Sequence, residues 1–215
     1  IEQRGDYMKN WVIGICTLAL LPGLAIAAPS YKEKIHYELV MPAQPTSTDK
    51  KVEVVEVFLY TCPHCNNLEP YVHRWLKKIP PEAEFVRMPA VFQPKQELHA
   101  RAYYAAEILG VLEKIHPAMF EAIHQQKRHF NTDADVQKLF VENGVSEKDF
   151  NRVFRSFAVE AKIRRAKDMS QRYGIPGVPA LIVDGKYRTG ARLAGGNANI
   201  FRVVDFLVAK ESDTK

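Results

Sequence analysis

The chain has 215 residues, of which 47% are hydrophobic and 26% are charged. This length and composition are typical of one sizeable folded domain, or of one domain with an insertion, and they exclude a low-complexity or disordered chain. The formal net charge of +5 is a small excess for this length, so we expect no nucleic-acid partner.

The N-terminal segment has the pattern of an export signal. Lys9 provides a short basic region, residues 11–21 form an apolar run, and residues 25–27 place small residues where an export peptidase cuts. The apolar run is shorter than the ~20 residues that a membrane-spanning helix needs. We therefore predict that residues 1–27 are an upstream extension and a signal peptide, cleaved after Ala27. The alternative is an anchor that stays uncleaved.

Strand and helix patterns alternate after this segment. A short strand is predicted over residues 35–40. The strongest strand pattern covers residues 52–60, because apolar residues occupy both faces, as in a central strand covered on both sides. A helix follows at once with Pro63 in its first turn, and Pro80 and the proline after it end this helix. Residues 83–88 then predict another strand.

The second half of the chain is helical before the strand pattern returns. From residue 94 to about residue 173 the apolar residues follow helical spacing throughout. Residues 180–183 and 186–189 predict two strands joined by an Asp-Gly turn, which favours a hairpin. Residues 197–209 predict a closing helix.

This order of elements predicts an α/β protein in which a mixed sheet flanked by helices is interrupted by an all-helical insertion. The first part of the α/β domain then covers residues 28–93, the helical insertion domain residues 94–173, and the second part residues 174–215.

The sequence Cys62-Pro63-His64-Cys65 directly follows the strongest predicted strand. Haem attachment requires a histidine after the second cysteine, where this chain has Asn66. A zinc site requires a second pair of ligands, but the third cysteine lies inside the predicted signal and the histidines are scattered, so we expect no metal. A disulfide that closes so small a loop would constrain the unfolded chain very little, which disfavours a purely structural role.

Redox chemistry fits the cysteine pair better. Cys62 is predicted at the start of a helix, where unpaired N–H groups and the positive end of the helix dipole stabilise a thiolate. A donating or protonated His64 would stabilise it further. A stabilised thiolate favours the reduced form, so the disulfide of such a pair is oxidising. Cys65, one turn into the helix, is expected to be the shielded resolving sulfur.

The cysteine motif, the sequence Gly177-Val178-Pro179-Ala180, the later Asp-Gly-Lys-Tyr hairpin and the helical block together resemble the DsbA family of periplasmic thiol:disulfide oxidoreductases. The resemblance covers about residues 52–209. It implies a thioredoxin-like fold with a helical insertion and a redox-active Cys62–Cys65 disulfide without any other cofactor. It also implies a periplasmic protein that oxidises reduced exported proteins and is reoxidised by a membrane quinone-linked partner of the DsbB type.

The same resemblance assigns roles to three further residues. Pro179 is expected to be a cis proline against the cysteine pair, with the Val178 backbone pairing with an extended substrate. Glu56 occupies the place of the family's buried acidic residue. A carboxylate inside a doubly covered strand is costly unless it is paired or protonated, so we predict that Glu56 handles a proton near Cys65. Glu53, nearer the start of the strand, is expected to reach solvent.

Two other functions stay open at this point: a disulfide isomerase or reductase, and a non-catalytic, chaperone-like binder of exported chains. Exported thioredoxin-like isomerases carry a separate dimerisation domain. Residues 28–51 are too few to form one, so we expect a monomer.

Overall fold

The structure is a computed structural model that describes residue 1, residues 30–48 and residues 50–212. From Tyr31 onward the chain forms one compact unit. The predicted signal peptide and its cleavage site lie outside the described residues. Within the described ranges, no helix has both the length and the apolar character needed to cross a membrane.

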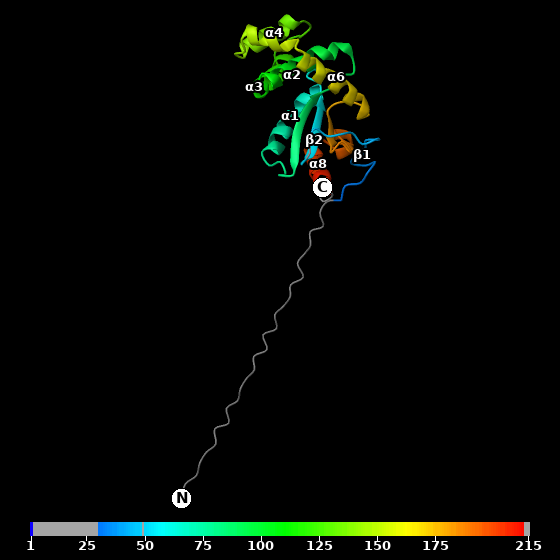
Figure 1. The fold of residues 1–215 in the computed structure, drawn as a ribbon. Coiled ribbons are helices and arrows are strands. Elements are labelled where there is room, and N and C mark those ends of the chain that lie inside the picture. Colours follow the sequence, from blue (N-terminus) through cyan, green and yellow to red (C-terminus); the bar gives the residue numbers. More distant parts are fainter. Residues whose placement is uncertain (2–29, 49, 213–215) are drawn as a thin grey trace. The chain divides into compact units, whose positions relative to one another are not determined.

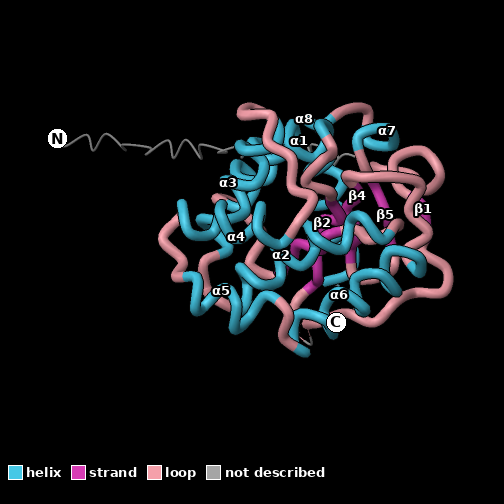
Figure 2. The backbone as a smooth tube through the Cα atoms, turned by 90° about the horizontal axis from the view of Figure 1, so that it is seen from above, coloured by secondary structure: helices cyan, strands magenta, loops and turns pink. Residues whose placement is uncertain are grey.

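In the part of the chain that the structure describes, five strands form one mixed sheet with the order β1-β5-β4-β2-β3. Figure 2 shows this sheet at the centre of the unit with helices around it. β2 runs parallel to β3, and all other neighbouring strands are antiparallel. The strands are β1 (Glu38–Leu39), β2 (Val52–Phe58), β3 (Ala83–Pro89), β4 (Ala180–Val183) and β5 (Tyr187–Thr189).

β2 is the central strand that the sequence predicts. All of its seven residues are buried, and its β-branched and aromatic side chains suit a strand that is covered on both faces. Its side chains alternate between the two faces, so Glu56 shares a face with Val54, whereas Glu53 shares the other with Val55.

Helices α1 (Pro63–Leu76) and α8 (Asn197–Ser212) cover one face of the sheet. Leu68 and Trp75 of α1 pack in one core cluster with Val54 of β2 and Val204 of α8. Apolar residues at helical spacing therefore bind α1 to the sheet, and the start of α1 is held at the end of β2.

The helical block packs against the other face and shares one continuous core with the sheet. Val55 and Val57 of β2 belong to the same cluster as Met119 and Phe140 of the block. In Figure 1 the helices of the block gather at one end of the sheet. They are the short 3₁₀ helix η1 (Pro94–Gln96), α2 (Glu97–Ile108), α3 (Leu112–His124), α4 (Asp133–Glu142), α5 (Glu147–Phe154) and α6 (Phe157–Arg172).

The fold class and the element order agree with the sequence-based expectation, with local differences. The strand predicted over residues 35–40 is reduced to the two residues of β1, because only these pair with β5. β2 ends at Phe58, two residues before the predicted end. The short helix α7 (Ala191–Ala194) was not predicted, since four residues carry no periodic pattern. The domain boundaries at residues 93/94 and 173/174 stay a prediction.

Candidate active site

The cysteine motif lies where β2 leads into α1. Cys62 is the N-cap residue of α1 with extended backbone angles, and Pro63 occupies the first helical turn. Proline suits this position because its missing N–H would have no partner there, and its fixed φ matches the helix. Cys65 is one turn further on and fully buried, whereas Cys62 is partly exposed. Both cysteines are free thiols in the structure, so the Cys62–Cys65 disulfide stays a prediction.

The environment of Cys62 stabilises its thiolate. A hydrogen bond from the Cys65 thiol, together with the backbone N–H groups of Cys65 and His64 and the charge of His64, lowers the pKa of Cys62 to about 5 against the effect of partial burial. The backbone donors belong to the open end of α1, as the sequence predicts. Cys62 therefore carries a thiolate at neutral pH.

Cys65 has the opposite environment. Its hydrogen bond to Cys62 and its burial raise its pKa far above the usual value for a thiol, and the charge of Glu56 adds to this effect. The pair is thus divided into one accessible thiolate and one shielded thiol. This is the arrangement expected of an attacking or leaving sulfur and a resolving sulfur.

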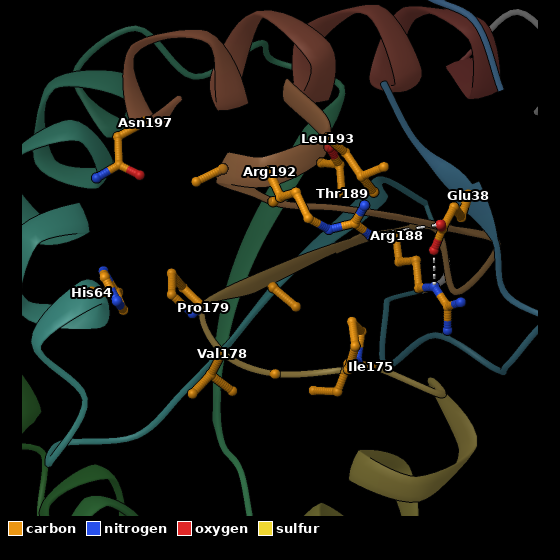
Figure 3. A pocket seen from close by; sticks show the side chains of 15 residues that line it. Glu38, His64, Ile175, Val178, Pro179, Arg188, Thr189, Arg192, Leu193 and Asn197 are labelled. Atoms are coloured by element: carbon orange, nitrogen blue, oxygen red, sulfur yellow. Dashed lines mark hydrogen bonds and ion pairs between the residues drawn. The ribbon is translucent and has the colours of Figure 1, made fainter. Parts of the chain in front are cut away.

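The loop before β4 lies against the cysteine motif. The Val178–Pro179 peptide bond is cis, as predicted, whereas the role of the two residues in substrate binding stays a prediction. Sγ of Cys62 lies 3.5 Å from the carbonyl oxygen of Val178 and donates a hydrogen bond to it when the thiol is protonated. His64 and this loop line a groove of about 430 Å³ that continues toward Arg188 and Arg192. Figure 3 shows His64 on its helix, with Pro179 and Val178 nearby on the loop.

Glu56 is fully buried, as the sequence predicts. Its Oε2 atom accepts a hydrogen bond of 3.2 Å from Nε of Arg87, the residue beside it in the register of β2 and β3. Its Oε1 atom has no hydrogen-bond partner among the described residues. Burial and the nearby Glu69 raise the pKa of Glu56 to about 8, although Arg87 opposes the shift. Glu56 is therefore mostly protonated at neutral pH.

Glu53 corrects one expectation. It does not reach solvent but is 3% exposed, and it accepts hydrogen bonds from the backbone N–H and the hydroxyl of Ser47. The connector between β1 and β2 folds back over this face of the sheet and supplies both donors. The sequence marks this connector only as a loop, so the contact was not predictable from it.

The structure adds a group of polar residues that the sequence analysis did not select. Nη2 of Arg87 donates to Glu69 over 3.1 Å, Glu69 contacts His116 over 3.3 Å, and His116 contacts the Tyr60 hydroxyl over 2.9 Å. One local signal was available: Glu69 lies four residues after Cys65, on the buried face of the helix. Arg87 and His116 come from distant elements and give no such signal.

The chain matches known proteins over most of its length. A family model described as a DSBA-like thioredoxin domain matches residues 53–208. The thiol:disulfide interchange protein DsbA of Pseudomonas syringae pv. tomato is 35% identical over 206 residues, which cover 95% of this chain and 96% of that protein. The crystal structure of Pseudomonas aeruginosa DsbA is 34% identical with a TM-score of 0.81, and the match covers 86% of this chain and 96% of that chain.

A structure of Proteus mirabilis DsbA with a non-covalently bound peptide, PWATCDS, is 25% identical with a TM-score of 0.70, and the match covers 85% of this chain and 98% of that chain. The range matched by the family model contains the cysteine motif, the loop around Pro179 and the helical block. This chain belongs to the DsbA family and is a thiol:disulfide oxidoreductase with a thioredoxin-like fold.

Proposed function

We propose that the chain works in the oxidising direction and donates a Cys62–Cys65 disulfide to reduced exported proteins. The observation that carries this proposal is the asymmetry of the two sulfurs. Cys62 is stabilised as a thiolate by the start of α1, and Cys65 is buried and held as a thiol. These features stabilise the reduced protein relative to its disulfide, so electrons flow from substrate thiols to the protein.

In the first step a substrate thiolate attacks Sγ of Cys62. The new bond joins the substrate sulfur to Cys62, the Cys62–Cys65 bond breaks, and its electron pair goes to Sγ of Cys65. Cys62 is the sulfur attacked because it is partly exposed, whereas Cys65 is fully buried. In the second step another substrate thiolate attacks the substrate sulfur of this mixed disulfide. Cys62 leaves as a stable thiolate, the substrate disulfide is complete, and the protein is reduced by two electrons.

Glu56 supplies a proton in the first step. The Cys65 thiolate formed there is unstable because it is buried, and burial raises the pKa of this thiol from an ordinary value that already lies above that of Glu56. Transfer of the Glu56 proton to Cys65, directly or through a water molecule, is therefore favourable. The buried location of Glu56 and its influence on the Cys65 pKa support this role. Solvent then restores the proton to Glu56.

The loop beside Cys62 serves as the substrate-binding surface. Val178 and Pro179 line the groove, and the carbonyl oxygen of Val178 is in contact with the accessible sulfur. An extended segment of a reduced protein can pair with the Val178 backbone, which binds substrates with little regard to sequence. The Proteus mirabilis relative has a peptide bound to it, which supports a peptide as the class of substrate for this chain.

The remaining parts of the proposal are expectations that membership of the DsbA family supports. The protein acts in the periplasm as a monomer, requires no metal or organic cofactor beyond the cysteine pair, and is reoxidised by a DsbB-type membrane partner linked to quinones. Sedimentation should report one chain of mature size. A stable dimer would contradict this part of the proposal.

Oxidation of a synthetic peptide with two cysteines tests the proposed function. The oxidised protein should convert the reduced peptide to its disulfide with one equivalent of protein per bond. Cys62→Ser should abolish this reaction, and Cys65→Ser should as well. Rapid rescue of a scrambled-disulfide substrate, or strong insulin reduction with weak peptide oxidation, would instead favour the isomerase or reductase. Unchanged binding of exported chains by a variant that lacks both thiols, without any peptide oxidation by the wild type, would favour the chaperone-like binder.

A further inference from the structure

His116 of α3 connects the helical block to Glu69, the carboxylate that shares Arg87 with Glu56. His116 is 3% exposed. Its Nδ1 atom lies 2.9 Å from the hydroxyl of Tyr60, two residues before Cys62, and its Nε2 atom lies 3.3 Å from Oε1 of Glu69 on α1. Helices α3 and α1 are in contact, and Figure 2 shows them on the same side of the molecule. One imidazole thus joins three segments that surround the cysteine pair.

The partners of His116 fix its tautomer. An ionised carboxylate can only accept hydrogen bonds, so Nε2 of His116 carries the ring proton and donates a hydrogen bond to Glu69. Nδ1 is then a bare acceptor, and the Tyr60 hydroxyl donates to it. Burial lowers the pKa of His116 despite its bond to Glu69, so the ring is neutral at neutral pH.

The two carboxylates beside Arg87 are hydrogen-bonded very differently. Glu69 accepts hydrogen bonds from Arg87 and from His116, and Nε2 of His73 lies 3.4 Å from its Oε2 atom. Glu56 accepts from Arg87 alone and has one oxygen without a partner among the described residues. Ionising both of two buried carboxylates that share one guanidinium costs free energy. The carboxylate with more hydrogen-bond donors therefore keeps the charge, and the other keeps a proton.

The ionisation of Glu69 depends on His116. Burial pushes the pKa of Glu69 upward, but the hydrogen bond from His116 and the charge of Arg87 outweigh burial and hold it below the usual value. His73 contributes less because it is 58% exposed to solvent, which screens its interaction. Unlike Arg87, His116 is a neutral donor, so it supports the charge of Glu69 without adding a positive charge to the site.

We propose that His116 is a positioning residue of the redox site: its hydrogen bond to Glu69 holds the negative charge there and leaves the shared proton on Glu56, next to Cys65. This inference rests on the proposed role of Glu56 in proton transfer. Through this hydrogen bond the helical block influences whether Glu56 holds the proton that the exchange reaction uses. Among the described residues, the other titratable or charged groups around Glu56, Glu69 and His116 include Cys65, Tyr60, His73, Arg87, Tyr103 and Glu113.

The test compares Tyr60→Phe with the double variant Tyr60→Phe/His116→Phe. Tyr60→Phe removes the hydroxyl but keeps the bond between His116 and Glu69. The double variant removes that bond as well, with a side chain of similar size and without leaving a buried hydroxyl unpaired. The reduced proteins, labelled with ¹³C at the glutamate carboxyl groups, are titrated by NMR, which reports the ionisation of Glu56 and Glu69 separately.

Tyr60→Phe should leave the midpoint of Glu56 near that of the wild type. In the double variant the midpoint of Glu56 should fall by about one pH unit or more, and that of Glu69 should rise. His116→Gln can still donate a hydrogen bond to Glu69, so the midpoints of Glu56 and Glu69 in this variant should stay close to those of the wild type. Equal Glu56 midpoints in Tyr60→Phe and in the double variant would overturn the inference.

The pH profile of peptide oxidation gives a second reading. In the double variant the loss of rate at high pH should begin about one pH unit lower than in Tyr60→Phe. The titration needs no thiol exchange, so the two proposals fail separately. A wild-type protein that does not oxidise the peptide would contradict the proposed function, whereas unchanged carboxyl titrations in an active protein would contradict the role of His116.

Discussion

The Cys62 thiol lies 3.5 Å from the main-chain carbonyl oxygen of Val178, a residue 116 positions later in the chain. This contact joins the start of α1 to the loop before β4. A thiol can donate to the carbonyl, but a thiolate cannot, so ionisation of Cys62 frees the Val178 carbonyl for another donor. The N–H of an extended substrate is such a donor. The accessible sulfur is therefore in direct contact with the backbone that we propose binds the substrate.

Cys62 should react with alkylating agents at acidic pH. Because its pKa is lowered to about 5, its rate of reaction with iodoacetamide should follow a titration with a midpoint near that value. Peptide mapping of reduced protein treated at pH 6 should find the label on Cys62 and almost none on Cys65. Faster labelling of Cys65 would contradict the assignment of the two sulfurs.

His64→Ser should raise the pKa of Cys62 modestly. His64 contributes through its charge, but the hydrogen bond from Cys65 has the larger effect and stays in place. A rise of about one pH unit corresponds to about 1.4 kcal/mol and makes the disulfide about 30 mV less oxidising. The thiolate absorbance of Cys62 measures the shift. His129→Ser, at an exposed position between α3 and α4, is the control and should change neither quantity.

The stability difference between the reduced and oxidised proteins should depend on pH. The pKa of Cys62 is lower in the folded reduced protein than in the unfolded chain, so the thiolate stabilises the reduced fold. This stabilisation is complete above the unfolded pKa of the thiol and is lost as pH falls through about 5. Urea unfolding of both forms at several pH values measures it. A reduced form that is no more stable at pH 8 than at pH 4, relative to the oxidised form, would exclude a stabilised thiolate.

Glu56→Gln should change the pH dependence of the first exchange step. In the wild type, Glu56 loses its proton above about pH 8, so attack on the disulfide, corrected for ionisation of the substrate thiol, should slow there by about tenfold or more. The variant should lack this decline. Glu53→Gln changes a buried carboxylate on the other face of the same strand, and this variant should still show the decline in rate at high pH. Identical profiles for Glu56→Gln and the wild type would leave Glu56 with a structural role only.

The same substitution should also alter stability in a pH-dependent way. The pKa of Glu56 is raised in the folded protein, so its protonated form stabilises the fold below the unfolded pKa, and this contribution is lost as pH rises through about 8. Relative to the wild type, Glu56→Gln should therefore gain about 1 kcal/mol or more in unfolding free energy between pH 5 and pH 8. Urea unfolding of both proteins measures this change, and a constant difference across that range would rule it out.

Local patterns were sufficient to predict the position of the cysteine pair. The run of β-branched residues in β2, followed by Cys62 and Pro63, specifies a strand that passes directly into a helix. Cys62 then lies at the open end of the helix and Cys65 inside it, as a consequence of helix geometry alone. The place of Pro179 was predicted from the family resemblance and not from any local pattern.

The polar partners of Glu56 could not be predicted in the same way. Arg87 reaches Glu56 only because the register of β2 and β3 places the two residues side by side. His116 reaches Glu69 only because α3 packs against α1. Such contacts depend on how distant elements pack, and a single sequence contains no periodic signal for them.

The equilibrium of the cysteine pair with glutathione measures the direction in which the protein works. If the start of α1 stabilises the Cys62 thiolate as described, the reduced form should predominate even when most of the glutathione is oxidised, so the disulfide is a stronger oxidant than glutathione disulfide. Thiol trapping of the protein in mixtures of reduced and oxidised glutathione gives the constant. A Cys62–Cys65 disulfide that persists in an excess of reduced glutathione would contradict the proposed oxidase.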